Sequence, residues 1–138
     1  MLVLTQHDQI LLALRDGTGY CDGKYNVPSG KLDEGETVLE ALVREAREEI
    51  GLTLATEELR HVATLHARNP EGQRRFGLFF TVEHDSARHG EPINVEPHKC
   101  AKIEWFPIDM LPDNTVPYTA AGIDLMRTGG TFGLVEWD

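Results

Sequence analysis

The segment 37–51 constrains the fold most, because both ends of an α-helix can be recognised in it. Thr37 followed three residues later by Glu40 is typical of a capping box at a helix N-terminus. Gly51 supplies the left-handed residue that commonly ends a helix. Between these ends, apolar residues recur at the spacing of one buried stripe, at Leu39, Leu42, Val43, Ala46 and Ile50. The sequence therefore predicts a helix that packs on a core by a single face.

Three glutamates crowd the C-terminal end of this predicted helix. At about 100° per residue, Glu45, Glu48 and Glu49 fall within an arc of roughly 100°. Like charges repel at this spacing, and the helix macrodipole makes the same end negative, where basic side chains would be stabilising. A sequence retains such a conflict where a site requires it. Because carboxylate oxygens without sulfur or imidazole favour a hard divalent cation, the cluster predicts a Mg²⁺ site, with Mn²⁺ as the alternative.

The segment ahead of the helix reads as a short strand that runs into a glycine-punctuated loop. Loop and helix together resemble the Nudix box, whose pattern fixes glycines, glutamates and an arginine at set intervals. The matching positions are Gly30, Glu36, Arg44, Glu45, Ala46, Glu48, Glu49, Gly51 and Leu52. A match at this many positions, with a strand before it and a helix within it, is far more specific than a lone glycine motif.

The resemblance implies an α/β/α sandwich with a mixed β-sheet, and hydrolysis of a nucleoside diphosphate linked to another moiety. It also implies that Glu45, Glu48 and Glu49 bind the metal, with a backbone carbonyl of Ser29 or Gly30 as a further ligand. The chemistry agrees, because a diphosphate must be neutralised and a water oriented for attack. A chain with a formal charge of −10 repels such a substrate, so bound cations have to supply the attraction.

The predicted catalytic residues are Arg44, Glu45, Glu48 and Glu96. Arg44 matches the family arginine that pairs with a box glutamate, a role suited to a planar guanidinium; the alternative is an ordinary surface arginine. The general base is either a box glutamate or a carboxylate from a distant loop. Glu96, which precedes a proline in a loop before a late strand, is the candidate there, and a solvated loop acid is the equal alternative.

Substrate contacts are less specific in the sequence. Asn114 lies where MutT-type enzymes read a guanine-like base with an asparagine, and the alternative is a turn or N-cap asparagine. Nucleobases also stack on aromatic side chains. Most of the aromatic residues are predicted to lie in the core, and Tyr25 is the predicted substrate contact. The candidates for stacking on a base are Tyr20, Tyr25, Phe76, Phe79, Phe80 and Trp105.

The most favoured function is therefore that of a MutT-like nucleoside triphosphate pyrophosphohydrolase, acting on ordinary or oxidised nucleotides. Alternatives within the class are ADP-ribose, another nucleotide sugar, a dinucleoside polyphosphate or capped RNA. Other classes are a nucleotide-binding Nudix module without turnover and an acidic interaction domain for a basic partner. Only 13 Lys and Arg stand against 23 acidic residues, without a basic tract, which argues against nucleic acid.

The length of 138 residues and the hydrophobic content of 41% predict one catalytic domain over residues 1–138. The apolar start is too short for a signal peptide or a membrane span, so no membrane partner is expected. Cys21 and Cys100 lack metal-binding or redox spacing, which predicts reduced thiols in the cytoplasm. The resemblance is also compatible with a homodimer.

Hydrophobic periodicity and turn residues predict the remaining elements. A hairpin is expected first, then a strand before the helix, two strands joined by a polar turn, a late strand, a second helix and a final strand. In residue numbers these are 1–5, 9–14, 25–27, 59–67, 76–82, 102–107, 119–127 and 131–137.

Overall fold

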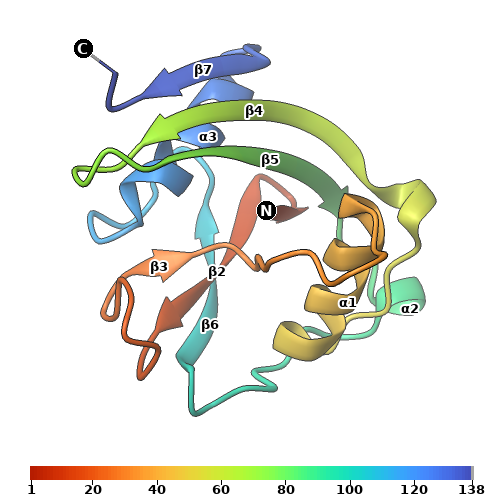
Figure 1. Cartoon of the computed structure of the whole chain (residues 1–138). Helices are drawn as coiled ribbons and strands as arrows, with labels where there is room; N and C mark the ends of the chain where they lie inside the picture. The colour runs from red at the N-terminus through yellow and green to blue at the C-terminus, as the bar shows by residue number, and fades with distance from the viewer. Residues whose placement is uncertain (138) are drawn as a thin grey trace.

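The computed structural model describes residues 1–137 and contains seven strands and three α-helices (Figure 1). The strands are β1 (Leu2–Gln6), β2 (Gln9–Arg15), β3 (Tyr25–Asn26), β4 (Arg60–Arg68), β5 (Arg74–Glu83), β6 (Cys100–Pro107) and β7 (Phe132–Val135). The helices are α1 (Val38–Ile50), α2 (Ser86–His89) and α3 (Pro117–Arg127), with a short 3-10 helix at Thr56–Glu58.

All seven strands join one mixed sheet, in the order β3-β2-β1-β5-β4-β7, with β6 paired along β2. The β1–β5 and β4–β7 pairs are parallel, and the other pairs are antiparallel. The predicted mixed sheet is therefore confirmed. Strand β3 and the end of β5 are not paired with each other, and the segment that follows β3 runs toward α1 (Figure 1).

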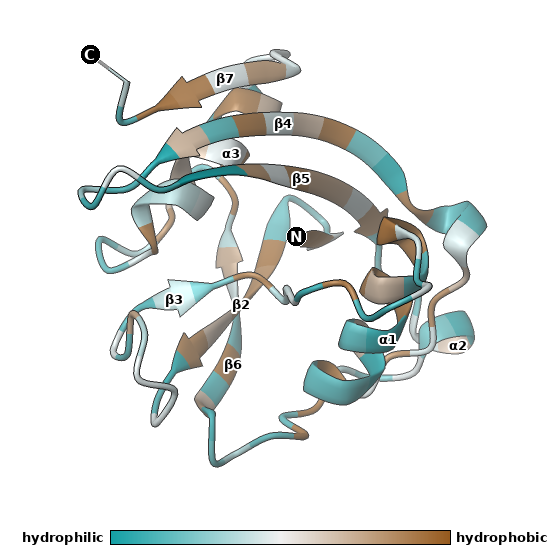
Figure 2. Cartoon of the chain, in the orientation of Figure 1, coloured by the Kyte–Doolittle hydropathy of each residue, from teal (hydrophilic) through white to brown (hydrophobic). Residues whose placement is uncertain are grey.

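The core is divided between the two faces of the sheet. Along β1, Leu2 and Leu4 pack in the cluster that contains the apolar stripe of α1, whereas Val3 packs with Ile123 of α3. This alternation is that of a strand buried on both faces. Hydrophobic residues mark the buried strands in Figure 2, and hydrophilic residues dominate the visible side of α1. The predicted α/β/α sandwich is confirmed.

The ends of α1 follow the sequence prediction closely. The Thr37 side chain accepts a hydrogen bond from the Glu40 amide, and the Glu40 carboxylate accepts one from the Thr37 amide. Gly51 has φ of 70°, the left-handed conformation that glycine adopts without strain. These two caps fix where α1 begins and ends, and therefore where along the helix its last-turn carboxylates lie.

Two short helical pieces, Thr56–Glu58 and α2, were not predicted. They are joined to each other by side chains: His89 Nε2 and Arg88 Nη2 each lie 2.8 Å from Glu58 Oε1. The His89 side chain is 1% exposed, so this buried contact holds α2 against the 3-10 helix that follows α1. Over residues 1–137, the structure holds no helix with the length and apolar character needed to span a bilayer.

Candidate active site

Arg44 organises the carboxylates at the end of α1. Its guanidinium binds Glu36 in bidentate fashion, at 2.7 and 2.9 Å. Nη1 also donates to Glu45 at 2.8 Å and to Glu48 at 3.2 Å, and Nη2 donates to the Lys31 carbonyl at 3.0 Å. These hydrogen bonds hold the pKa of Glu36 below its usual range. One arginine thus ties the loop before α1 to two of the predicted metal ligands.

The loop passes directly over the glutamates. The Ser29 amide donates to Glu49 at 3.1 Å. Gly30 lies so close to Glu45 that an added Cβ would overlap the Glu45 carboxylate, so any other residue there would displace this side chain. Because both contacts involve the backbone, the carbonyls of Ser29 and Gly30 are held beside the carboxylates.

Glu49 is the most electrostatically strained of these acids. Its pKa is raised to about 8, first by burial and then by the nearby charge of Glu45, with Glu96 adding a smaller effect. Burial also raises the pKa of Glu45, although its hydrogen bond from Arg44 opposes this. The cluster therefore disfavours its own full ionisation.

Glu96 reaches this cluster from a loop distant in sequence. The loop is hydrogen-bonded to the end of α1, since the Ile93 amide donates to the Ile50 carbonyl at 2.9 Å and the Val95 amide to the Glu49 carbonyl at 3.3 Å. The Glu96 carboxylate lies 3.8 Å from Lys99 Nζ and is 27% exposed. The structure therefore brings Glu96 together with the predicted box glutamates.

These side chains line a cavity of about 710 Å³, which we name the acidic cavity. Its polar lining combines carboxylates with cations that can meet a phosphate. Its charged side chains and loop backbone belong to Arg15, Ser29, Gly30, Lys31, Glu45, Glu48, Glu49, Glu96 and Lys99.

The predicted ligand atoms in this cavity are carboxylate and carbonyl oxygens, which suit a hard divalent cation. No three His, Cys, Asp or Glu side chains within residues 1–137 are already grouped as a metal site. Glu45 and Glu48 are instead engaged by Arg44. The raised pKa of Glu49 shows that negative charge is unfavourable here, and a cation would relieve it. The residues therefore fit a metal ion in their chemistry.

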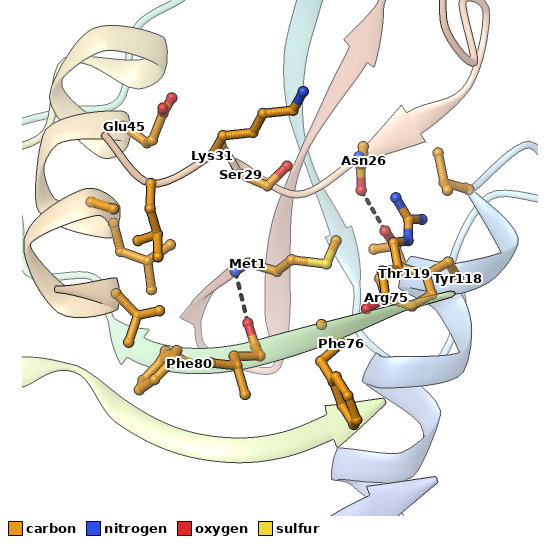
Figure 3. A pocket seen from close by; sticks show the side chains of 18 of the residues that line it. Met1, Asn26, Ser29, Lys31, Glu45, Arg75, Phe76, Phe80, Tyr118 and Thr119 are labelled. Carbon is orange, nitrogen blue, oxygen red and sulfur yellow. Dashed lines mark hydrogen bonds between the residues drawn. The ribbon is translucent and has the colours of Figure 1, made fainter. Parts of the chain in front are cut away.

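A second cavity, of about 650 Å³, adjoins the first and is mostly apolar; we name it the apolar cavity. Figure 3 shows it between β5 and the segment that runs from Asn26 to Lys31, with Glu45 on one side and α3 on the other. Leu42, Leu78 and Phe80 contribute to its apolar wall. Both cavities include Ser29, Gly30, Lys31 and Glu45, so they share a boundary.

Asn26 is a buried polar residue of the apolar cavity, with 8% of its surface exposed. Its Oδ1 accepts hydrogen bonds from the Val27 amide, at 2.9 Å, and from the Thr119 hydroxyl. Because the oxygen has two protein donors, the side-chain orientation is fixed, and Nδ2 is left to meet a ligand. Asn26 and Thr119 were not predicted as site residues, and the only signal in the sequence was a polar residue at the end of a buried strand.

Two predicted substrate contacts lie outside the lining of both cavities. Tyr25 belongs to the core, where its hydroxyl donates to Glu104 at 3.2 Å and its ring packs edge-on against Phe106. Asn114 is exposed, and its Nδ2 donates to the Gly23 carbonyl at 3.0 Å. In this structure both side chains therefore have structural partners, and their roles with substrate stay predictions.

Without divalent cations, the free energy of unfolding should fall as pH rises from about 5 to 8. The pKa of Glu49 is about 8 in the folded protein, against an ordinary value of 4.5. The folded state then binds a proton more tightly than the unfolded state. This difference in proton affinity contributes its full stabilisation below pH 4.5, and the contribution is lost as pH rises toward 8. Urea unfolding in chelator at pH 6 and pH 8 measures this difference. An identical pH dependence in Glu49→Gln would contradict the assignment.

The sequence matches a known protein family over most of its length. The family model for the Nudix domain matches residues 1–125. The oxidized purine nucleoside triphosphate hydrolase of Mus musculus is 28% identical over 113 residues, which are 81% of this chain and 67% of that protein. The 8-oxo-dGDP phosphatase NUDT18 of Homo sapiens is 39% identical over 56 residues, or 41% of this chain; the match spans only 17% of the human protein.

Among solved structures, a MutT Nudix hydrolase from Burkholderia pseudomallei aligns with a TM-score of 0.77 and 25% identity. The alignment covers 89% of this chain and 92% of that one, so nearly all elements correspond. Nudix enzymes act on small nucleotide substrates and generally use a divalent metal. Because the domain model spans most of the sequence and the fold agrees with it, this chain belongs to the Nudix hydrolase family.

Proposed function

We propose that this protein is a Mg²⁺-dependent pyrophosphohydrolase of the MutT-like branch that cleaves a nucleoside triphosphate, with Mn²⁺ as an alternative metal. The observation that carries the proposal is the shared boundary between the acidic cavity and the apolar cavity. A nucleotide has the same two halves, a charged phosphate chain and a flat base with little charge. Oxidised nucleotides fall within the proposal because the mouse relative is named for hydrolysing them.

On the phosphate side, we assign Glu45, Glu48 and Glu49 as metal ligands, with carbonyls of Ser29 and Gly30 as additional ligands. A bound divalent cation supplies charge neutralisation for the diphosphate and acidifies a water. Arg44 positions Glu45 and Glu48 through the hydrogen bonds described above.

For the proton transfer, Glu96 is the proposed general base. It lines the acidic cavity from a loop separate from the metal ligands, and it is partly exposed, so it can accept a proton from a water. The box glutamates Glu45 and Glu48 are the alternatives. A Glu96→Gln variant separates these assignments, because it removes the base without removing a proposed metal ligand.

On the base side, Asn26 is the side chain that we assign to substrate recognition, because it is buried, fixed in orientation and part of the cavity wall. Contact of Asn114 and Tyr25 with the substrate stays a prediction from the sequence. The Tyr25 hydroxyl and the Asn114 Nδ2 already have protein acceptors in this structure.

The most informative test is a hydrolysis screen with Mg²⁺ or Mn²⁺ in which both products are identified. Release of pyrophosphate and a nucleoside monophosphate from nucleoside triphosphates would support the proposal. The panel includes oxidised nucleotides, ADP-ribose, a nucleotide sugar and a dinucleoside polyphosphate. Turnover of these last three alone would move the protein to another branch of the family, and no turnover of any would refute the enzymatic assignment.

Adding Mg²⁺ should raise the melting temperature. An ion that binds only the folded state stabilises it by about 2.7 kcal/mol when its concentration is 100 times the Kd. For a chain of this length, that corresponds to roughly 8 °C. Differential scanning calorimetry at constant ionic strength measures the shift. Potassium chloride is the control salt, and a shift of equal size in Glu49→Gln would contradict the proposed site.

The single domain over residues 1–138, the cytoplasmic location and a homodimeric state also belong to this proposal. Cys21 and Cys100 are both free, which agrees with a reducing compartment. Sedimentation of the purified chain determines its oligomeric state.

A further inference from the structure

Strand β7 forms one edge of the sheet and has unused backbone groups. It pairs with β4 on one side, and no other strand of residues 1–137 pairs with its far side (Figure 1). The Thr64 amide donates to the Thr131 carbonyl at 2.9 Å, so this carbonyl faces β4. Because the backbone groups of successive residues in a strand alternate in direction, those of Phe132 and Leu134 face away from β4. The edge therefore carries N–H groups and carbonyls to which a further strand can bond.

The same two residues expose large apolar side chains. Phe132 is 58% exposed and Leu134 is 60% exposed, and hydrophobic residues along β7 are visible in Figure 2. Gly133, which lies between them, faces Leu65 and Leu125, so Phe132 and Leu134 lie on the face of the sheet opposite α3. An open edge with exposed apolar side chains is a surface on which another strand pairs readily.

The two ends of β7 carry opposite charges. Glu136 follows the strand directly, and Arg127 ends α3, ahead of the turn that leads into β7. Both side chains are exposed, and neither forms an ion pair with another residue of the described part of the chain. A twofold axis through the middle of β7 brings each end beside the opposite end of a second copy. The edge is therefore complementary to itself in charge.

From these features we infer that β7 pairs in antiparallel fashion with β7 of a second copy of this chain, which joins the two sheets into one. Hydrogen-bonded pairs join residues whose backbone groups face the open edge, so Phe132 lies opposite Leu134 of the second copy, with Gly133 at the axis. Each of these symmetric pairs exchanges two backbone hydrogen bonds and places the two apolar side chains side by side.

The charged ends agree with this register. Pairing about Gly133 sets Glu136 opposite Gly130 of the second copy, which is three residues from Arg127 in the sequence. Two ion pairs related by the twofold axis can form there. The inference rests on the homodimeric state proposed above and assigns its interface, which involves none of the proposed catalytic or metal-binding residues.

Sedimentation velocity of the whole chain over about a 100-fold range of concentration measures the association. A pair of short edge strands is a small contact, so we expect a dimer that dissociates on dilution. Leu134→Pro should raise the dimer Kd about 10-fold, because it removes one intermolecular hydrogen bond per copy. The Leu134 amide does not face β4, so the variant should keep its fold, which circular dichroism checks. Leu134→Val retains the amide and is the control.

A charge reversal tests the register. Glu136→Arg should raise the dimer Kd at least about 3-fold at low ionic strength, because it places like charges beside Arg127 of the second copy. Adding Arg127→Glu to the same chain should restore the wild-type Kd, since the twofold contact then has its charges exchanged. Glu57→Arg, at an exposed acid of the 3-10 helix, alters the net charge equally and should leave the Kd unchanged.

A chain that stays monomeric over the whole range would overturn the inference. A dimer whose Kd is the same in wild type, Leu134→Pro and Glu136→Arg would also overturn it, and would leave the homodimeric state with another interface. The outcomes are distinct from those for the proposed function. Hydrolysis by a monomeric chain removes only the inference, whereas a dimer sensitive to these variants but without turnover removes only the enzymatic proposal.

Discussion

Replacing Glu49 by glutamine should lower Mg²⁺-dependent hydrolysis at least about 100-fold, since even residues that merely support a metal ligand typically contribute factors of 10 to 100. The amide keeps the shape of the side chain and its hydrogen bond from the Ser29 amide, but it removes the charge that a cation requires. Steady-state kinetics at saturating nucleotide and several Mg²⁺ concentrations measure the loss. Glu83→Gln, an exposed acid at the end of β5, is the control.

The same variant should be more stable than wild type in chelator at pH 8. Glu49 is forced to ionise there in a buried place near Glu45 and Glu96, whereas glutamine carries no charge. Lost activity together with gained stability is the combination expected of a residue placed for function. A variant that is both inactive and less stable at pH 8 would indicate a structural role for Glu49.

Replacing Gly30 by alanine should reduce activity by about 100-fold, which is the cost commonly attached to a small displacement of a reacting group. The new methyl group would occupy the place of the Glu45 carboxylate, which must then leave its position beside Arg44. Because the displaced atoms belong to the end of a flexible side chain, we expect the protein to remain folded. Circular dichroism and steady-state kinetics of the purified variant test the two expectations separately.

Gly133→Ala in β7 is the control for this substitution. A Cβ there would lie 3.3 Å from Leu65, a tight contact with a side-chain methyl far from the acidic cavity. It should therefore keep its activity. Full activity in Gly30→Ala would mean that the Glu45 position seen here is not required for turnover.

The positions of most helices and strands could be predicted because their determinants are local, whereas the sandwich itself was expected from the family resemblance. The capping box at Thr37 and the stop at Gly51 set the bounds of α1, and period-two and apolar runs located the strands. The 3-10 helix and α2 were missed because three or four residues are too few to show a helical period. The two pieces are linked by a contact between His89 and Glu58, which lie far apart in the sequence.

The candidate site divides in the same way. The glutamates of α1 share one helix turn, so their convergence follows from the sequence alone. The hydrogen-bonded pair in the apolar cavity instead joins β3 and α3, and no spacing within the chain relates Asn26 to Thr119. Glu96 could be predicted as a candidate, but its approach to Glu49 depends on how its loop attaches to α1.

The attachment of the Glu96 loop to α1 couples this loop to local unfolding of the helix end. The amides of Ile93 and Val95 bond to carbonyls at the end of α1, so fraying of the last helical turn would release the loop and carry Glu96 away from the glutamates. Deuterium uptake at these two amides therefore reports whether the site is assembled. A ligand that bridges the helix and the loop should slow the uptake of both together.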